Sequence, residues 1–241
     1  MKVESGARRV RVMLGGQFVA DTIHPLLVWE SPHYPTYYFP EADVATDLLV
    51  ETGEVTSSPS RGDAVQYKVE AGGRMGTAHG YPDSKLPELT GHYAFVWDTM
   101  DHWFEEDEEV FVHARDPYTR IDIVPSSRRV RVEIEGECVA DTTGAVFLFE
   151  TGLPTRYYLP KTDVRMDMLT PTDRVTRCPY KGTARYWTVQ AAGEAHENFV
   201  WGYDAPLPES QKILGMVAFY NEKVDIYVDG ILQERPRTKF S

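Results

Sequence analysis

The chain contains an internal repeat. Residues 8–70 align with residues 128–190 at a constant offset of 120 and without a gap, and 25 of the 63 positions are identical. Identical columns include Arg8–Val12 with Arg128–Val132 and Val19–Thr22 with Val139–Thr142. A repeat of this length predicts the same folded unit twice. Pro125-Ser126-Ser127 breaks the chain between the copies, so we predict domains at residues 1–125 and 126–241.

Alternation of apolar and polar residues dominates both copies. Val10, Val12 and Leu14 alternate with polar or longer side chains, and Gly15-Gly16 follows as a turn signal. The pattern predicts a mainly β fold of antiparallel sheets. The expected strands are 10–14, 17–21, 26–30, 37–39, 64–69, 110–113 and 120–124, then 130–134, 138–141, 146–150, 157–159, 184–189 and 224–228. Asp229-Gly230 predicts a hairpin turn near the C-terminus.

Helix signals are few and short. Residues 40–43 and 160–163 each predict a single turn that starts at proline. Residues 208–215 predict a short helix with proline at its start and glycine at its end. The acidic run Glu105–Glu109 has the character of a solvated turn, because contiguous carboxylates repel and lack the alternate spacing of a calcium loop.

Charge and hydropathy exclude several classes of function. The net charge of −12 would repel a phosphate backbone, so we expect no nucleic-acid partner. No apolar run approaches the roughly 20 residues of a membrane-spanning helix, so we expect no membrane partner. The first seven residues lack the apolar core of a secretory signal, and Cys138 and Cys178 cannot form a disulfide framework. A cytoplasmic location follows as the expectation.

Metal and cofactor motifs are missing from the sequence. The seven histidines show no ligand spacing and there is no Cys-x-x-Cys pair. A phosphate-binding glycine loop, a Gly-x-Ser-x-Gly elbow and a dinucleotide fingerprint are also absent. We therefore expect neither a bound metal nor a cofactor.

One segment of the second copy concentrates reactive groups. Cys178 precedes Pro179 and lies three residues before Lys181, whereas the first copy has Ser58 and Arg61 at the two positions. A nearby ammonium favours the thiolate, which is the nucleophilic form of cysteine. A small buried thiol at the end of a strand explains the sequence equally well, because free cysteine is among the most buried residue types.

A second segment of the same copy combines a carboxylate, a guanidinium and two phenols. Glu150, Arg156, Tyr157 and Tyr158 lie in one presumed hairpin, and successive tyrosines on a strand must point to opposite faces. Pairing of Glu150 with Arg156, or bracing of a loop, is the favoured interpretation. Trp201 and Tyr220 add aromatic surface of a kind that usually belongs to a core.

The segment Cys178-Pro179-Tyr180-Lys181-Gly182, with Tyr157-Tyr158-Leu159-Pro160 upstream and Ala218-Phe219-Tyr220 downstream, resembles the family catalogued as domain of unknown function number 427. The resemblance covers both copies and implies β-tent folds, in which two antiparallel sheets meet. Related tents include sulfoxide reductases and zinc-binding modules, whose zinc cysteines are missing here. Some family members carry a nucleotidyltransferase label, but this chain lacks the glycine pair and spaced aspartates for magnesium.

The resemblance also marks positions of the second copy. They are Glu150, Tyr157, Tyr158, Asp163, Cys178, Pro179, Lys181 and Gly182. Since Ser58 and Arg61 depart from this pattern, it implies that the first copy is a supporting or diverged domain.

The leading hypothesis is an enzyme acting on a small polar or carbonyl-bearing metabolite in the second copy. Cys178, Lys181 and Glu150 are the candidate catalytic residues. The candidate ligand-binding residues are Arg156, Tyr157, Tyr158, Asp163, Tyr180, Trp201 and Tyr220. The same groups also fit a non-catalytic module that only binds a small ligand, and the repeat fits an interaction scaffold.

Overall fold

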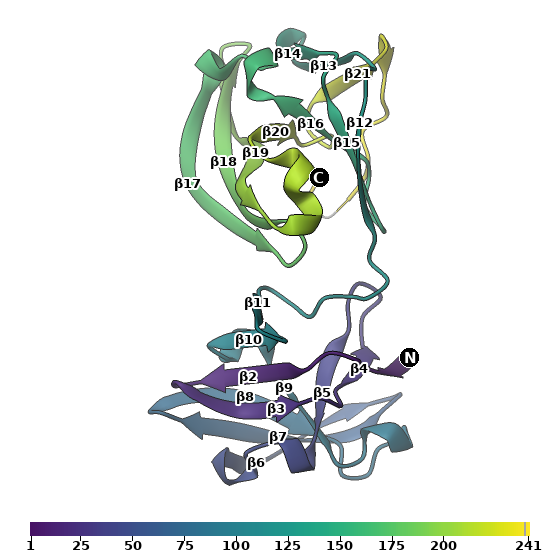
Figure 1. Cartoon of the computed structure of the whole chain (residues 1–241), viewed down its shortest axis with the longest axis vertical. Coiled ribbons are helices and arrows are strands. Elements are labelled where there is room, and N and C mark those ends of the chain that lie inside the picture. The colour runs from purple at the N-terminus through teal and green to yellow at the C-terminus, as the bar shows by residue number, and fades with distance from the viewer. Residues whose placement is uncertain (239) are drawn as a thin grey trace. The chain divides into compact units, whose positions relative to one another are not determined.

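The chain folds into two compact units in a computed structural model that describes residues 1–238 and 240–241. The first unit spans Met1–Pro117 and the second spans Tyr118–Ser241 (Figure 1). Strands make up 56% of the residues and helices 10%, so each unit is mainly β.

The first unit begins with a short strand that precedes the repeated segment. Its strands are β1 (Lys2–Ser5), β2 (Val10–Leu14), β3 (Gln17–Thr22), β4 (Leu26–Trp29), β5 (Thr36–Pro40), β6 (Leu49–Ser58), β7 (Gly62–Ala71), β8 (Arg74–Gly80), β9 (His92–Phe95), β10 (His102–Glu105) and β11 (Glu108–Val110). Single 3-10 turns connect some of them: η1 (Glu41–Asp43), η2 (Thr46–Leu48), η3 (Pro87–Leu89) and η4 (Trp97–Thr99).

The second unit repeats the same succession. Its strands are β12 (Ile121–Pro125), β13 (Val130–Ile134), β14 (Glu137–Thr142), β15 (Val146–Glu150), β16 (Arg156–Pro160), β17 (Leu169–Cys178), β18 (Gly182–Ala191), β19 (Glu194–Pro206), β20 (Met216–Phe219), β21 (Asp225–Val228) and β22 (Ile231–Leu232). Its 3-10 helices are η5 (Lys161–Asp163), η6 (Met166–Met168) and η7 (Pro208–Ile213).

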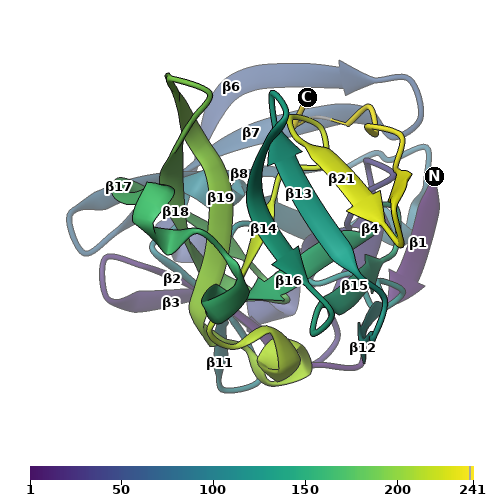
Figure 2. The same cartoon turned by 90° about the horizontal axis from the view of Figure 1, so that it is seen from above.

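Each unit consists of a large and a small antiparallel sheet. In the described residues the large sheets run β1-β4-β5-β9-β8-β7-β6 and β12-β15-β16-β20-β19-β18-β17. The small sheets run β11-β10-β2-β3 and β14-β13-β21-β22, and Figure 2 shows β14, β13 and β21 side by side. The strand order is the same in both units, which confirms the prediction of two tandem β-tent-like domains with few short helices.

The core of each unit lies between its two sheets. Val10, Val12 and Leu14 are at most 1% exposed, because alternate residues of β2 face the large sheet. Val130, Val132 and Ile134 of β13 repeat this pattern in the second unit. A second cluster covers the opposite face of each large sheet, and it contains Tyr38 in the first unit and Tyr158 in the second.

Two predicted features of the first unit need correction. The predicted strand at residues 110–113 is wrong, because β10 and not that segment pairs with β2, in the place that β21 has beside β13. The acidic run does form the turn between β10 and β11, but Glu105 is only 4% exposed. Its carboxylate accepts hydrogen bonds from Arg8 and from the hydroxyl of Tyr37, which compensate for its burial.

The division between the units falls earlier than the expected boundary at residue 125. Strand β12 pairs with β15 over its whole length and therefore belongs to the second unit, as β1 belongs to the first by pairing with β4. The backbone of Arg120 also bonds to Thr151. The chain thus crosses from one unit to the other at Pro117–Tyr118.

The helices are all short 3-10 segments. Among the described residues none has the length and apolar character needed to span a membrane.

Candidate functional site

The site in the second unit is built on the turn between β17 and β18. Cys178 ends β17 and pairs with Gly182, the first residue of β18, so Pro179, Tyr180 and Lys181 form the turn between them. Gly182 has a φ of 96°, which glycine adopts at little cost, and an added Cβ would lie 3.2 Å from the carbonyl oxygen of Ala205. Gly62 has a φ of 94° at the same place in the first unit. The conserved glycine therefore fixes how this turn presents residue 181.

Lys181 forms a buried ion pair with Glu150. The ammonium group donates to Oε2 of Glu150, and the two side chains are 11% and 8% exposed. Glu150 ends β15 and Lys181 precedes β18, so the pair joins strands that are not neighbours in the sheet. A buried ion pair is weak evidence for added stability, since desolvation offsets the attraction.

Two buried tyrosines lie beside this pair. Tyr158 is 1% exposed, and its hydroxyl accepts a hydrogen bond of 3.1 Å from Nε1 of Trp201. Burial raises the pKa of Tyr158 far above its ordinary value, and the charges of Glu150 and Cys178 raise it further. Burial and the neighbouring Tyr158 raise the pKa of Tyr203 as well. Both phenols therefore stay protonated at neutral pH and are hydrogen-bond donors rather than bases.

Cys178 lies at the rim of this group. The thiol is partly exposed, as is that of Cys138. Thr176, two residues earlier on β17, lies 2.8 Å from the hydroxyl of Tyr186, which packs with Tyr158 and Tyr203, so strand alternation places Cys178 on that face of the large sheet. Cys138 instead donates to the carbonyl of Ala140, at 3.6 Å.

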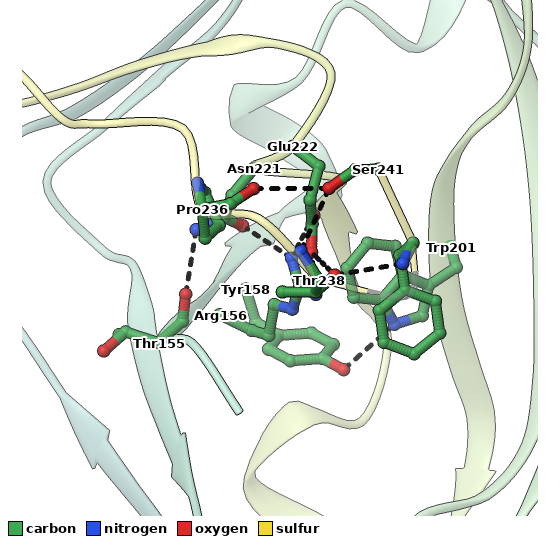
Figure 3. A network of polar contacts seen from close by, with 10 residues as sticks. Thr155, Arg156, Tyr158, Trp201, Asn221, Glu222, Pro236, Thr238 and Ser241 are labelled. Carbon is green, nitrogen blue, oxygen red and sulfur yellow. Dashed lines mark hydrogen bonds and ion pairs between the residues drawn. The ribbon is translucent and has the colours of Figure 1, made fainter. Parts of the chain in front are cut away.

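Arg156 belongs to a different network (Figure 3). Its guanidinium makes two hydrogen bonds of 2.7 Å to the two oxygens of Glu222, and Nη1 makes a third, of 3.2 Å, to Asn221. The expected pairing of Arg156 with Glu150 is therefore wrong. Glu222 occupies the edge of the guanidinium that an anionic ligand would use.

Aromatic rings and the C-terminal segment enclose this second ion pair. The guanidinium carbon lies 5.5 Å from the ring centre of Trp201, 5.9 Å from that of Tyr220 and 5.7 Å from that of Phe240. Thr238 donates to Glu222 at 2.6 Å. Burial opposes ionisation of Glu222, but the hydrogen bonds from Arg156 and Thr238 lower its pKa below the ordinary value. The network ties the C-terminal segment to β16 (Figure 3).

Two of the predicted ligand-binding residues, Tyr157 and Asp163, lie apart from the ion pair, whereas Tyr180 directly precedes Lys181 in the turn. Tyr157 packs on the opposite face of the large sheet, with its ring 4.8 Å from that of Phe147. Asp163 accepts a hydrogen bond of 2.6 Å from Thr142, as Asp43 does from Thr22 in the first unit. Tyr180 places its backbone carbonyl 3.3 Å from the hydroxyl of Ser210. The structure thus gives Asp163 a bracing role that is common to both repeats.

The first unit repeats the polar cluster with other side chains. Arg61 takes the place of Lys181, and its Nη1 lies 3.0 Å from Glu30, the counterpart of Glu150. Tyr38 takes the place of Tyr158, and Nε2 of His79 lies 3.2 Å from its hydroxyl where Trp201 lies in the second unit. The first copy has therefore kept a cation, a carboxylate and a tyrosine at equivalent positions.

Sequence comparison missed several members of these clusters, namely His79, Tyr81, Tyr203 and Glu222. The ungapped repeat ends before them, because β18 and β19 pair through register shifts at Gly182–Ala184 and at Trp187–Val189. The strand pairing identifies the equivalent residues. His79 pairs with Gln66 and Trp201 pairs with Tyr186, and Gln66 and Tyr186 are aligned in the repeat, so His79 and Trp201 occupy equivalent positions. The sequence signal that could have shown this equivalence is a tyrosine two residues later in both copies, Tyr81 after His79 and Tyr203 after Trp201.

No three His, Cys, Asp or Glu side chains gather as metal ligands would in the part of the chain that the structure describes. The expected absence of zinc and of a cofactor stays a prediction.

Two like units, each with a large and a small antiparallel sheet, define a tandem, mainly β protein in which both units place an ion pair beside a buried tyrosine. The model of the family described as Domain of unknown function (DUF427) matches residues 2–106 and again residues 122–230. The chain belongs to this family and contains two copies of its domain. No protein of curated function matches the chain.

Proposed function

We propose that the second unit is the site of an enzyme that acts on a small carbonyl-bearing metabolite. The observation that supports the proposal is the buried Lys181–Glu150 pair, with Cys178 following Thr176 on the face of β17 that packs against the Tyr158 cluster. These residues would supply a nucleophile, a group that takes a proton and two groups that give one. Arg156 is not part of this proposal because Glu222 already binds it.

The chemistry follows from the protonation states of these groups. Sulfur of Cys178 forms a bond to the carbonyl carbon while the carbonyl π bond breaks. The thiol proton passes to Glu150, and Lys181 gives a proton to the oxygen that becomes a hydroxyl. Tyr158, which burial keeps protonated, stabilises that oxygen by donating a hydrogen bond while charge develops on it.

Thiol alkylation is the first test, because Cys138 provides a matched control of similar exposure. We expect iodoacetamide to modify Cys178 faster than Cys138 at neutral pH, and the difference to shrink in Lys181→Gln, which removes the neighbouring positive charge. Peptide mass spectrometry over a time course measures both rates in one sample. Equal rates, or faster modification of Cys138, would contradict a nucleophilic Cys178.

Turnover separates an enzyme from a binding module. NMR screening of small aldehydes and keto acids against the wild type, Cys178→Ala and Ser58→Ala should show conversion that only Cys178→Ala abolishes. Cys178→Ala should cost only about 1 kcal/mol of stability, the usual scale for a change outside a tightly packed core. Ligand-induced shifts without conversion in any variant would favour the non-catalytic binding module instead.

A further inference from the structure

The first unit contains a buried guanidinium with unsatisfied donors. Nε and Nη1 of Arg61 are buried and have no hydrogen-bond acceptor in the part of the chain that the structure describes. Nη1 lies 3.0 Å from Oε1 of Glu30, close enough for an ion pair but without the alignment of a hydrogen bond. A buried donor without an acceptor is costly and calls for a partner.

Polar groups of β5, of β8 and of the residue that follows β4 surround Arg61. The hydroxyl of Tyr38 donates to Oε1 of Glu30 at 2.6 Å and lies 3.2 Å from Nε2 of His79. A phenol has one proton, which Tyr38 gives to Glu30, so His79 must donate to Tyr38 through Nε2–H. Trp201 donates to Tyr158 in the same way in the second unit. The chain of donors ends on the carboxylate of Glu30, which lies beside Arg61.

Tyr81 closes the other side of this cluster. Its ring centre lies 5.5 Å from the guanidinium carbon of Arg61, 6.4 Å from the ring of Tyr38 and 5.8 Å from that of His79. Both contacts to Glu30 fall on Oε1, so within the described residues Oε2 is left to accept from another group. The cluster thus presents guanidinium donors and a carboxylate acceptor side by side.

Solvent reaches the pair more easily here than in the second unit. The side chain of Glu30 is 26% exposed and that of Arg61 is 17% exposed, against 8% for Glu150 and 11% for Lys181. In the second unit the ammonium of Lys181 donates a hydrogen bond to its carboxylate partner. The first unit therefore combines a more exposed ion pair with unused hydrogen-bonding capacity on two buried nitrogen atoms of Arg61.

We propose that the first unit holds a second binding site, which takes a small α-amino acid through its carboxylate on Arg61 and its ammonium on Glu30. A guanidinium matches a carboxylate in shape and charge, and Oε2 of Glu30 offers the acceptor for the ammonium. A zwitterion adds no net charge next to Glu30 in a protein of net charge −12, whereas a phosphate or a simple carboxylate would. The first copy is then a binding unit rather than a supporting domain.

Glycine and acetate are the probes, because they differ only in the ammonium group. In the full-length protein we expect glycine to shift the NMR signals of Arg61 Nε–H and the His79 ring in a saturable manner, and acetate to bind more weakly. Arg61→Gln should weaken glycine binding about tenfold or more, the scale of a lost charged hydrogen bond. Arg74→Gln, which changes an exposed arginine of the same unit, should leave glycine binding as in the wild type.

Glu30→Gln tests the role of the carboxylate. It should weaken glycine binding and remove the preference for glycine over acetate, while binding of acetate persists. Thermal melting of each variant checks that it is folded, and Arg61→Lys, which copies the second unit, gives a second variant if Arg61→Gln unfolds.

Several outcomes would overturn the proposal. They are shifts that do not saturate with glycine, saturable shifts that survive Arg61→Gln in a folded protein, and a glycine preference that survives Glu30→Gln. Because the signals come from the first unit, these results leave the enzyme proposal for Cys178 and Lys181 to its own tests.

Discussion

At the scale of residues, the N–H group that donates to the buried tyrosine differs between the two clusters. His79 donates to Tyr38 in the first unit, and Trp201 donates to Tyr158 in the second. Both units therefore have this hydrogen bond at the same place in the fold, but the donor is an imidazole in one and an indole in the other. An indole cannot take up a proton at ordinary pH, whereas an imidazole can. The first cluster is therefore sensitive to acid in a way that the second is not.

Acid should weaken the first cluster through His79. Burial, reinforced by the charge of Arg61, lowers the pKa of His79 below 6.5 and outweighs the opposite effect of Glu30. The unfolded chain thus binds the proton more readily, so the stability from neutral His79 is complete above the unfolded pKa and is lost as the pH falls through the lower, folded pKa. We expect an NMR titration of the His79 ring to give an apparent pKa below 6.5. His79→Gln, which keeps an N–H donor, should flatten the fall in stability between about pH 7 and pH 5.

The Arg156–Glu222 pair should be costly to break from one side. Glu222→Gln leaves a buried guanidinium without its carboxylate, and we expect a loss of about 3 to 5 kcal/mol in urea unfolding. The double change Arg156→Met with Glu222→Leu should cost less than this, since it leaves no buried charge. If the double variant is as unstable as Glu222→Gln, the two side chains stabilise the fold through their packing rather than through their charges.

At the scale of elements, the sequence predicted the strands with clear alternation, but it missed the polar edge strands and also β8, β9, β19 and β20, which carry buried residues. Strands β2 and β13 alternate in burial as they do in hydropathy, and the sequence located both. Strands β6 and β17 are polar edge strands with mostly exposed residues, so no apolar period marks them. Glu105 looked solvated because its partners, Arg8 and Tyr37, lie far away in the sequence.

The candidate site was predictable in part for the same reason. The repeat pointed to Cys178 and Lys181 because they differ between the copies, and the opposite orientation of Tyr157 and Tyr158 followed from strand geometry. The ion-pair partners could not be predicted. Whether Glu150 pairs with Arg156 or with Lys181 depends on the order of strands in the large sheet. The hydropathy pattern of each strand does not determine that order.

At the scale of the whole molecule, each unit includes one strand, β1 or β12, that lies before the aligned repeat at residues 8–70 or 128–190. Strand β12 buries Ile123 in the cluster around Tyr158 and hydrogen-bonds to β15. A division at residue 125 would separate this strand from its sheet, although the sequence there looks like a linker.

Fragments test this division directly. We expect residues 1–117 and 118–241, expressed separately, to fold with the NMR spectra of the full chain. Residues 126–241 should be less stable than 118–241 by about 3 kcal/mol or more, because the fragment loses the buried Ile123 and leaves β15 as an unpaired edge. Urea unfolding of the two fragments measures the difference, and equal midpoints would place β12 outside the folded unit.

The equal strand order of the two units makes the protein its own reference system. Both clusters share one expression level, one buffer and one history of handling, so any difference between them in a single sample reflects their side chains alone. Three exchanges, Ser58→Cys, Arg61→Lys and His79→Trp, would carry the first cluster stepwise toward the second on an almost unchanged backbone. Such a series would show at which exchange one chemistry gives way to the other.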